Sequence, residues 1–468
     1  MRTRIPLFLF FLFLYLSCSM NSNKKLLGII SLAREILPTS SSISIQYPTN
    51  LIFYVNAKVN ITPTVQGSIS SYSISPSLPS GLSINSSNGA IQGIPTSVAS
   101  ATDYTITAGS LTATVNLQIK NTTSSRVYGQ LGDFTTGTSN KGGVSADSLN
   151  SPRNCAVDKD DNLYIADTNN NRVLFYLKGS TTATRVYGQL GSFTSNTANN
   201  GGRSADTLNS PRGVYVDANN FVYIADTTND RVLAYENNST TATKVFGQQD
   251  GFTTGTSNLG GLSAQSLNSP RGAIRDKNNL LYLFDTDNHR LLSFPDTSST
   301  ANDVYGQDNL FTTNSSGLTS SKFNAPFSIV FDSSNNLYVA DLYNNRVLFF
   351  PKNTKTASTV YGQQGSFTTS IANNGGLSSI SLDSPIGVQI DRSNGLYVAD
   401  GGNNRVLYFP ENSTTATIVF GQNDSFTSNT ANNGGRSALS LNNPRGVCID
   451  SAGGLYVIDD DNNRVLYY

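Results

Sequence analysis

The sequence predicts an all-β protein, because one short block with strand-like flanks recurs six times along its 468 residues. In each block, two apolar runs enclose a polar loop that opens with Asp and closes with Arg, as in residues 163–174. The closing arginines are spaced by 59 residues, apart from one spacing of 56 residues. This regular period indicates a single structural unit that is repeated. The six Asp and Arg pairs are Asp167 and Arg172, Asp226 and Arg231, Asp285 and Arg290, Asp341 and Arg346, Asp400 and Arg405, and Asp459 and Arg464.

Each unit is predicted to contain four short strands. In the second unit these are residues 213–217, 222–226, 231–235 and 244–248, where β-branched and aromatic residues alternate between turn-forming residues. Four strands per unit, without helical periodicity between units, favour a six-bladed β-propeller over a helical solenoid. A lone fourth strand at residues 126–130 precedes the first unit, and the last unit has only three strands. We expect the early strand to complete the last blade and so remove an open sheet edge.

The motifs Pro-x-Gly-Val-x-x-Asp, Leu-Tyr-Val-Ala-Asp and Asn-Asn-Arg-Val-Leu recur along residues 126–468. This series resembles NHL repeats, and the resemblance implies the same propeller fold. It implies less about function, since NHL propellers serve as binding platforms and, less often, as enzymes.

The N-terminal segment has the features of a secretory signal. Basic residues precede an apolar run at residues 5–16, which is too short to span a bilayer as a helix. Residues 14–18 resemble a bacterial lipobox, although Tyr15 stands where Leu is favoured, and the resemblance implies lipid attachment to Cys18. An ordinary secretory signal that ends near a cysteine is the alternative. We therefore expect residues 1–18 to be a signal peptide and the protein to be exported to the cell envelope, lipid-anchored at the outer surface or in the periplasm.

The segment between the signal and the propeller is predicted to have two parts. Residues 19–43 are polar and Ser-rich in large part and suit a tether. Residues 44–120 contain alternating runs, such as 111–119, that predict a small antiparallel β domain. The runs 77–84 and 88–96 resemble the immunoglobulin-like or cadherin-like modules of bacterial surface proteins, which implies a β-sandwich that acts as a spacer or as an adhesive module. The propeller is then residues 121–468.

Charge and cysteine content narrow the range of partners. Thirty-one basic residues balance thirty-one acidic ones, so the net charge favours neither nucleic acid nor a membrane surface. Membrane contact is expected through the acyl anchor alone, and the protein is expected to be a monomer.

Cys155 and Cys448 fall in the first strands of the first and last blades but one position apart. Because a shift of one position reverses the face of a strand, we expect two buried thiols and no disulfide.

The residues of known catalytic sites are scarce in this chain. His289 is the single histidine, and it stands where the other repeats carry Asn or Asp. NHL-type amidating lyases hold zinc with several histidines, and the similar propeller lactonases use histidine and calcium. One histidine cannot supply either arrangement. The chain also lacks a Gly-x-Ser-x-Gly elbow, a Cys-x-x-Cys pair and a phosphate loop. The acidic runs 158–162 and 459–462 suit turns better than calcium loops. We expect no enzyme activity, no metal and no cofactor.

A feature that is present in every blade is expected to be structural, whereas a site for one ligand should appear as a departure from the repeat. The Asp and Arg pairs occur in every unit and are expected to hold the loop after the second strand by a charge-assisted hydrogen bond. Long loops such as 190–210 enter each first strand, whereas the opposite turns are tight. On the long-loop face, the residue after each unit's proline is arginine in four consecutive blades and apolar in the other two. Arg275 is a further charge at an otherwise apolar position. The predicted ligand-binding residues are Arg153, Arg212, Arg271, Arg445, Arg275, Phe327 and Ile386.

Three functions agree with these patterns. The first is non-catalytic recognition of a protein or glycan ligand at the long-loop face, since arginine suits carboxylates and anionic sugars. The second is a lyase or hydrolase that acts on an anionic polysaccharide with a tyrosine as base. The third is a purely structural envelope protein, in which the arginines only neutralise acidic loop residues such as Asp167.

Overall fold

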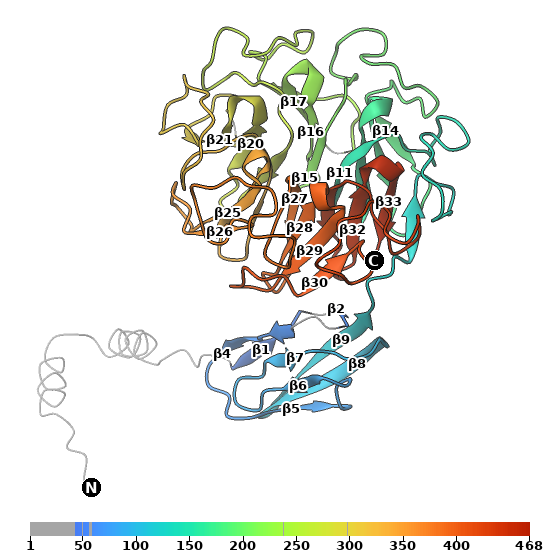
Figure 1. Cartoon of the computed structure of the whole chain (residues 1–468), viewed down its shortest axis with the longest axis vertical. Coiled ribbons are helices and arrows are strands. Elements are labelled where there is room, and N and C mark those ends of the chain that lie inside the picture. The colour runs from blue at the N-terminus through green and yellow to red at the C-terminus, as the bar shows by residue number, and fades with distance from the viewer. Residues whose placement is uncertain (1–42, 49, 56–58, 237, 297) are drawn as a thin grey trace, which may run out of the picture.

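The computed structural model describes residues 43–468, except residues 49, 56–58, 237 and 297. It confirms the predicted fold class: a small β-sandwich is followed by a ring of four-stranded sheets (Figure 1). The predicted signal peptide, Cys18 and nearly all of the predicted tether lie outside the described residues. Within the described ranges, no helix has the length and apolar character needed to cross a bilayer.

The small domain is built from two main sheets around an apolar core. One sheet has the order β2-β9-β8-β5, with β2 parallel to β9, and the other has the order β3-β7-β6. Ile106, Val115 and Leu117 are fully buried in this core. The strands are β1 (Ser44–Gln46), β2 (Asn50–Tyr54), β3 (Val59–Ile61), β4 (Thr64–Gln66), β5 (Tyr72–Ser75), β6 (Leu82–Ile84), β7 (Ile91–Gly93), β8 (Ala99–Ala108) and β9 (Leu111–Lys120).

The propeller blades are antiparallel sheets whose first strands line a central channel of about 280 Å³. Blade 1 contains β11 (Pro152–Val157), β12 (Leu163–Asp167), β13 (Arg172–Tyr176) and β14 (Arg185–Tyr187). Blade 2 contains β15 (Gly213–Val216), β16 (Val222–Asp226), β17 (Arg231–Tyr235) and β18 (Lys244–Phe246). Blade 3 contains β19 (Ala273–Arg275), β20 (Leu281–Asp285), β21 (Arg290–Phe294) and β22 (Asp303–Tyr305).

The later blades repeat this arrangement, and the ring closes as predicted. Blade 4 contains β23 (Pro326–Phe331), β24 (Leu337–Asp341), β25 (Arg346–Phe350) and β26 (Thr359–Tyr361). Blade 5 contains β27 (Pro385–Ile390), β28 (Leu396–Asp400), β29 (Arg405–Phe409) and β30 (Ile418–Phe420). Blade 6 contains β31 (Pro444–Ile449), β32 (Leu455–Asp459) and β33 (Arg464–Tyr467), and β10 (Arg126–Tyr128) pairs with β33 as its fourth strand.

The prediction of two free thiols is wrong, because Cys155 and Cys448 form a disulfide with their Cα atoms 5.9 Å apart. The offset of one position is real: Cys155 lies opposite Ile165 across its sheet, whereas Cys448 lies opposite Tyr456. A shift of one position reverses the face of a side chain only within one sheet, and these two strands belong to different sheets. Neighbouring blades pack with opposite faces together. Residues that are one position apart in the repeat, such as Cys155 and Cys448, therefore meet at the boundary between two blades. The disulfide therefore joins the first and last blades beside the channel.

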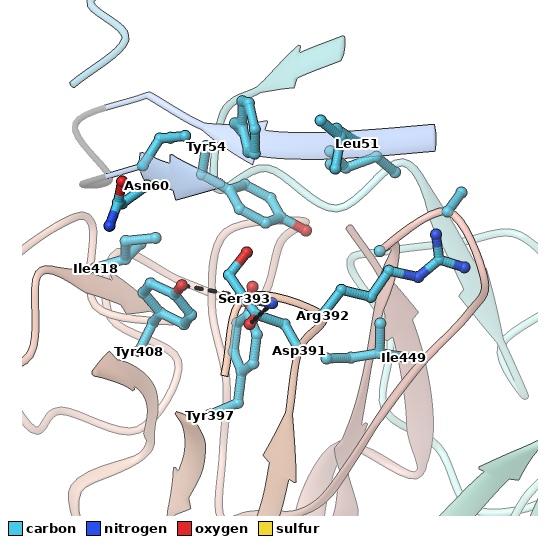
Figure 2. Close-up of a pocket in the computed structure, with 15 residues that line it drawn as sticks. Leu51, Tyr54, Asn60, Asp391, Arg392, Ser393, Tyr397, Tyr408, Ile418 and Ile449 are labelled. Carbon is cyan, nitrogen blue, oxygen red and sulfur yellow. Dashed lines mark hydrogen bonds between the residues drawn. The ribbon is translucent and has the colours of Figure 1, made fainter. Parts of the chain in front are cut away.

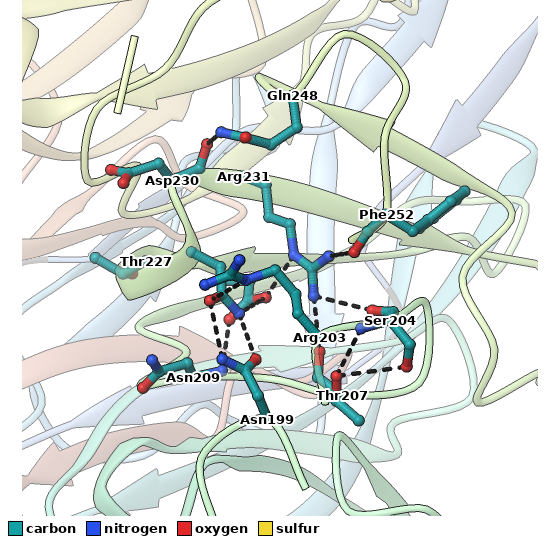
Figure 3. A network of polar contacts seen from close by, with 12 residues as sticks. Asn199, Arg203, Ser204, Thr207, Asn209, Thr227, Asp230, Arg231, Gln248 and Phe252 are labelled. Atoms are coloured by element: carbon teal, nitrogen blue, oxygen red, sulfur yellow. Dashed lines mark hydrogen bonds and ion pairs between the residues drawn. The ribbon is translucent and has the colours of Figure 1, made fainter. Parts of the chain in front are cut away.

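A short 3-10 helix follows the second strand of each blade and carries the repeated Asp and Arg pair at its ends. In blade 2, Arg231 Nε donates to Asp226 over 2.7 Å, and both side chains are fully buried. Arg231 Nη2 donates to the carbonyl oxygens of Ser204 and Thr207, each over 2.9 Å, and Nη1 donates to the carbonyl of Phe252 (Figure 3). One guanidinium thus joins the loop before its blade to the loop after it. The six helices are η1 (Thr168–Asn170), η2 (Thr227–Asn229), η3 (Thr286–Asn288), η4 (Leu342–Asn344), η5 (Gly401–Asn403) and η6 (Asp460–Asn462).

The small domain packs directly on the tight-turn face of blades 5 and 6. Tyr54 is 2% exposed, and its ring lies edge-on to the ring of Phe420 with centroids 5.3 Å apart. Lys120 Nζ donates to the carbonyl oxygen of Tyr468 over 3.2 Å. Figure 2 shows Tyr54 against the turn that contains Asp391 and Ser393. The small domain is therefore in fixed contact with the propeller, on the face opposite to the long loops.

Replacement of one buried guanidinium should be severely destabilising. We expect Arg231→Met to lower the free energy of unfolding by about 3–5 kcal/mol, because the carboxylate of Asp226 stays buried without its partner. Urea unfolding measures the change. The matched control is Lys159→Met, which breaks an ion pair with Asp160 whose side chains are 54% and 58% exposed. It should cost less than about 1 kcal/mol. Equal losses in the two variants would contradict a structural role for the buried pair.

Removal of the disulfide should destabilise the ring. The double variant Cys155→Ala, Cys448→Ala is expected to unfold with a free energy lower by about 2–4 kcal/mol, since the unfolded chain gains freedom when this long loop opens. The measurement is urea unfolding of the oxidised protein with and without a reductant. The reductant should weaken the wild-type protein and leave the double variant unchanged. A wild-type protein that is indifferent to reductant would show that the cross-link is absent in solution.

Candidate functional site

The predicted arginines lie where the first strands begin, on the long-loop face. Each follows a proline that opens or immediately precedes a first strand, and each first strand then runs along the channel to the tight turns on the other face. We call Arg153, Arg212, Arg271 and Arg445 the arginine rim. Phe327 and Ile386 take the same position in the two remaining blades.

Close backbone packing draws the members of the arginine rim together. A Cβ atom on Gly213 would lie 2.1 Å from the carbonyl oxygen of Arg271. A Cβ atom on Gly446 would lie 3.0 Å from the carbonyl oxygen of Arg153, and one on Gly387 would lie 2.6 Å from that of Arg445. Neighbouring first strands therefore touch through glycine at this end of the channel. A side chain at these positions would push the blades apart and separate the arginines.

The charges of the arginine rim are only partly compensated. Asp460, which is 2% exposed, pairs with Arg445 and lies 3.9 Å from Arg153. Arg271 lies 4.0 Å from Asp287, and Arg212 forms no ion pair with any residue that the structure describes. The Nε atoms of Arg153, Arg212 and Arg271 are buried, and none of them has a hydrogen-bond partner among the described residues.

Burial and mutual repulsion act on these guanidinium groups. Burial, with Arg445 nearby, lowers the pKa of Arg153 to about 10. Burial, with Arg212 nearby, lowers the pKa of Arg271 to about 10. The pKa of Arg212 is lowered by burial and by Arg445. All three groups stay charged near neutral pH, so the arginine rim is a crowded group of cations whose repulsion a bound anion would relieve.

The other half of this face is apolar. Phe327, Leu342 and Ile386 are each less than 9% exposed and form a cluster of their own. Tyr343 stands beside this cluster and is 63% exposed. The guanidinium of Arg271 lies over the ring of Phe327 at 4.7 Å, which joins the cationic half to the apolar half. Phe327 and Ile386 thus border the arginine rim, as predicted from their shared position in the repeat.

Arg275 is not part of this cluster. It ends β19, at the tight-turn end of the channel, whereas Arg271 precedes that strand. Its Nε lies 3.1 Å from Asp217, and its Nη2 lies 2.7 Å from Asp296 and 2.6 Å from the hydroxyl of Tyr223. The expectation that Arg275 adds to the same ligand site is therefore wrong. The first strand carries residues 271 and 275 to opposite ends of the channel, and the charge of Arg275 is already met by two carboxylates.

His289 takes the place of a backbone-bonding asparagine. It ends η3 with φ of 54°, as Asn171 ends η1. Asn171 Oδ1 accepts the N–H of Ser210 over 2.8 Å, and His289 Nδ1 accepts the N–H of Ala325 over 3.0 Å. Burial lowers the pKa of His289, which favours the neutral ring that can accept this bond. The side chain thus performs the structural role that the repeat predicts for it.

Outside the arginine rim, we considered metal-binding groups and one small cavity, and neither resembles a developed site. Within the ranges that the structure describes, no group of His, Cys, Asp and Glu side chains is arranged to hold a metal ion. A cavity of about 60 Å³ lies between the domains, where the hydroxyl of Tyr54 is buried without a partner (Figure 2). That space suits one or two water molecules.

Three residues of the long-loop face were missed in the sequence analysis. Asp460 stands where three other blades carry Thr168, Thr227 and Thr286. Tyr343 is the one aromatic residue at its position in the repeat, and Asp383 is the one acid where the other five blades carry Asn. A search for departures from a constant position would have found Asp383, whereas the positions of Tyr343 and Asp460 vary among the blades and give no such signal.

Comparisons with known proteins agree with both parts of this architecture. The family described as "Putative Ig domain" matches residues 35–129, and the NHL repeat matches residues 208–235 and 441–468. No curated protein sequence is significantly similar to the chain.

One solved structure shares the fold at low identity, and others are similar at a lower level. A structural genomics protein of unknown function from Bacteroides thetaiotaomicron is 13% identical with a TM-score of 0.52, over 92% of this chain and 98% of that one. An auxiliary nutrient binding protein from Bacteroides ovatus is 12% identical with a TM-score of 0.45, over 92% and 98%. A gluconolactonase from Xanthomonas campestris is 13% identical with a TM-score of 0.44, over 73% and 97%. The chain therefore consists of an immunoglobulin-like domain followed by an NHL-repeat β-propeller.

Proposed function

We propose that this protein is an exported, lipid-anchored binding protein that recognises an anionic ligand, carried by a protein or a glycan, at the arginine rim and without catalysis. The observation that carries the proposal is the clustering of four arginines from consecutive blades, one of which, Arg212, forms no ion pair with any residue that the structure describes. Guanidinium groups are weakly hydrated and match the geometry of carboxylates, which favours recognition of such groups.

The placement of the two domains supports a role at a cell surface. The small domain covers the tight-turn face of blades 5 and 6, and the arginine rim lies at the other end of the channel. An anchor at Cys18 would be joined to the small domain by residues 19–43. The arginine rim would then be free to face away from the membrane, toward the surroundings.

Arg212 provides the sharpest test of the arginine rim, because its loss leaves no carboxylate without an ion-pair partner. We expect the lipid-free chain 19–468 to bind polygalacturonate or polyglutamate at low salt and more weakly as salt is added. Arg212→Gln should weaken that binding by about tenfold or more, the value of one hydrogen bond to a charged group. Isothermal titration calorimetry gives the affinities.

The matched control for this test is Arg392→Gln, which removes an exposed arginine on the tight-turn face. It should leave the affinity for either polymer unchanged. If neither polymer binds the wild-type chain, or if both variants weaken binding equally, the arginine rim is not the recognition site.

Anchoring can be tested independently of the ligand. In a bacterium that processes lipoproteins, the full chain should fractionate with membranes, and Cys18→Ser should move it to the soluble fraction. Metabolic labelling with a fatty acid should mark the wild-type chain alone. A Cys18→Ser variant that remains with the membranes would contradict the acyl anchor, and it would leave the arginine rim unaffected.

A further inference from the structure

We propose that the ligand of the arginine rim is a carboxylated sugar, of the kind found in uronate-containing oligosaccharides. This inference rests on the proposed function and deepens it. A carboxylate alone would need only the arginines. The long-loop face also carries an exposed aromatic ring in blade 4 and an acidic side chain at the start of blade 5, and such groups can bind the remainder of a sugar ring.

The exposed ring belongs to Tyr343, which is held in a fixed position. Its backbone N–H donates to the carbonyl oxygen of Asn324 over 3.2 Å, and that of Leu342 donates to Ala325 over 3.3 Å. Leu342, one residue earlier, is buried in the cluster with Phe327 and Ile386. The backbone of Tyr343 is thus held in place, and 63% of the residue is exposed. An exposed aromatic ring can contact the C–H face of a sugar.

This ring lies next to the cations. Tyr343 follows Leu342, which packs against Phe327, and the guanidinium of Arg271 lies over the ring of Phe327 at 4.7 Å. A ligand that lies against Tyr343 can thus place a carboxylate beside Arg271.

An acidic side chain precedes the first strand of the next blade, blade 5. Asp383 is half-buried, and Ser384, the next residue, donates its N–H to Asn345 Oδ1 in the Tyr343 loop over 2.7 Å. Asp383 forms no ion pair with the residues that the structure describes. A carboxylate here accepts hydrogen bonds from hydroxyl groups and repels other acids. A uronate sugar has hydroxyls to offer at this point, whereas an acidic peptide would bring further negative charge. The glycan is therefore the better fit.

The experiment measures the binding of three ligands to the chain 19–468. The ligands differ in whether they contain sugar rings and in whether they carry negative charge. The probes are a short oligogalacturonate, its methyl ester and a polyglutamate peptide with the same number of carboxylates. We expect the oligogalacturonate to bind more tightly than the peptide, and the methyl ester to bind at least about tenfold more weakly than the free acid, since it lacks the charge.

Variants of Tyr343 test the ring itself. Tyr343→Thr introduces the residue that blade 2 carries at this position, Thr228, so the fold should be kept. It should weaken oligogalacturonate binding about five- to tenfold and leave polyglutamate binding unchanged. Tyr343→Phe should retain most of the affinity. The control is Leu177→Ala, which removes a 52% exposed apolar side chain on the opposite face and should have no effect.

The outcomes distinguish this inference from the proposed function. Polyglutamate binding that equals oligogalacturonate binding, and that does not depend on Tyr343, would overturn the sugar assignment and keep an anion site at the arginine rim. Absence of binding to every charged probe would overturn both.

Discussion

The structure depends above all on one buried interaction, the contact of each arginine that opens a third strand with the aspartate that ends the second. In blade 1, Arg172 donates to Asp167 over 2.7 Å and also to the carbonyl oxygens of Ser145, Ser148 and Phe193. A buried guanidinium is tolerated because these four acceptors use its donors. The same side chain joins the loop before the blade to the loop after it, so the long-loop face is rigid before any ligand arrives.

Three further contacts stabilise the closed ring. The strand β10 closes the outer edge of blade 6, the disulfide joins the inner strands of blades 1 and 6, and the small domain packs on blades 5 and 6 through Tyr54 and Lys120. The first two act where the early and the late parts of the propeller chain meet, and the small domain packs beside them. Within blade 6, β10 and β33 are held together by strand pairing and are not joined by a turn, unlike the third and fourth strands of the other blades.

The regular repeat makes the asymmetry of the long-loop face visible. Arginine occupies the position after the proline in four consecutive blades, and Phe327 and Ile386 replace it in the other two. Glycine contacts between first strands bring the arginines close to their neighbours in the ring. The propeller thus gathers side chains that are up to 292 residues apart, from Arg153 to Arg445, into one surface.

The sequence by itself determined the number of blades, their strands, the closure by residues 126–128 and the structural role of the Asp and Arg pairs, because periodicity and strand alternation are local signals. It also placed the arginine rim, since a departure from a repeat is visible in the chain. The contacts between blades were decided only by the tertiary structure. Parity along a strand says nothing about which face the next blade presents, so the disulfide was missed. Position in the repeat likewise did not show that the loop of Leu342 and Tyr343 packs against Phe327 beside Arg271, because that contact depends on how neighbouring parts of the ring converge. The place of Arg275 could have been predicted, since a single strand carries it away from Arg271.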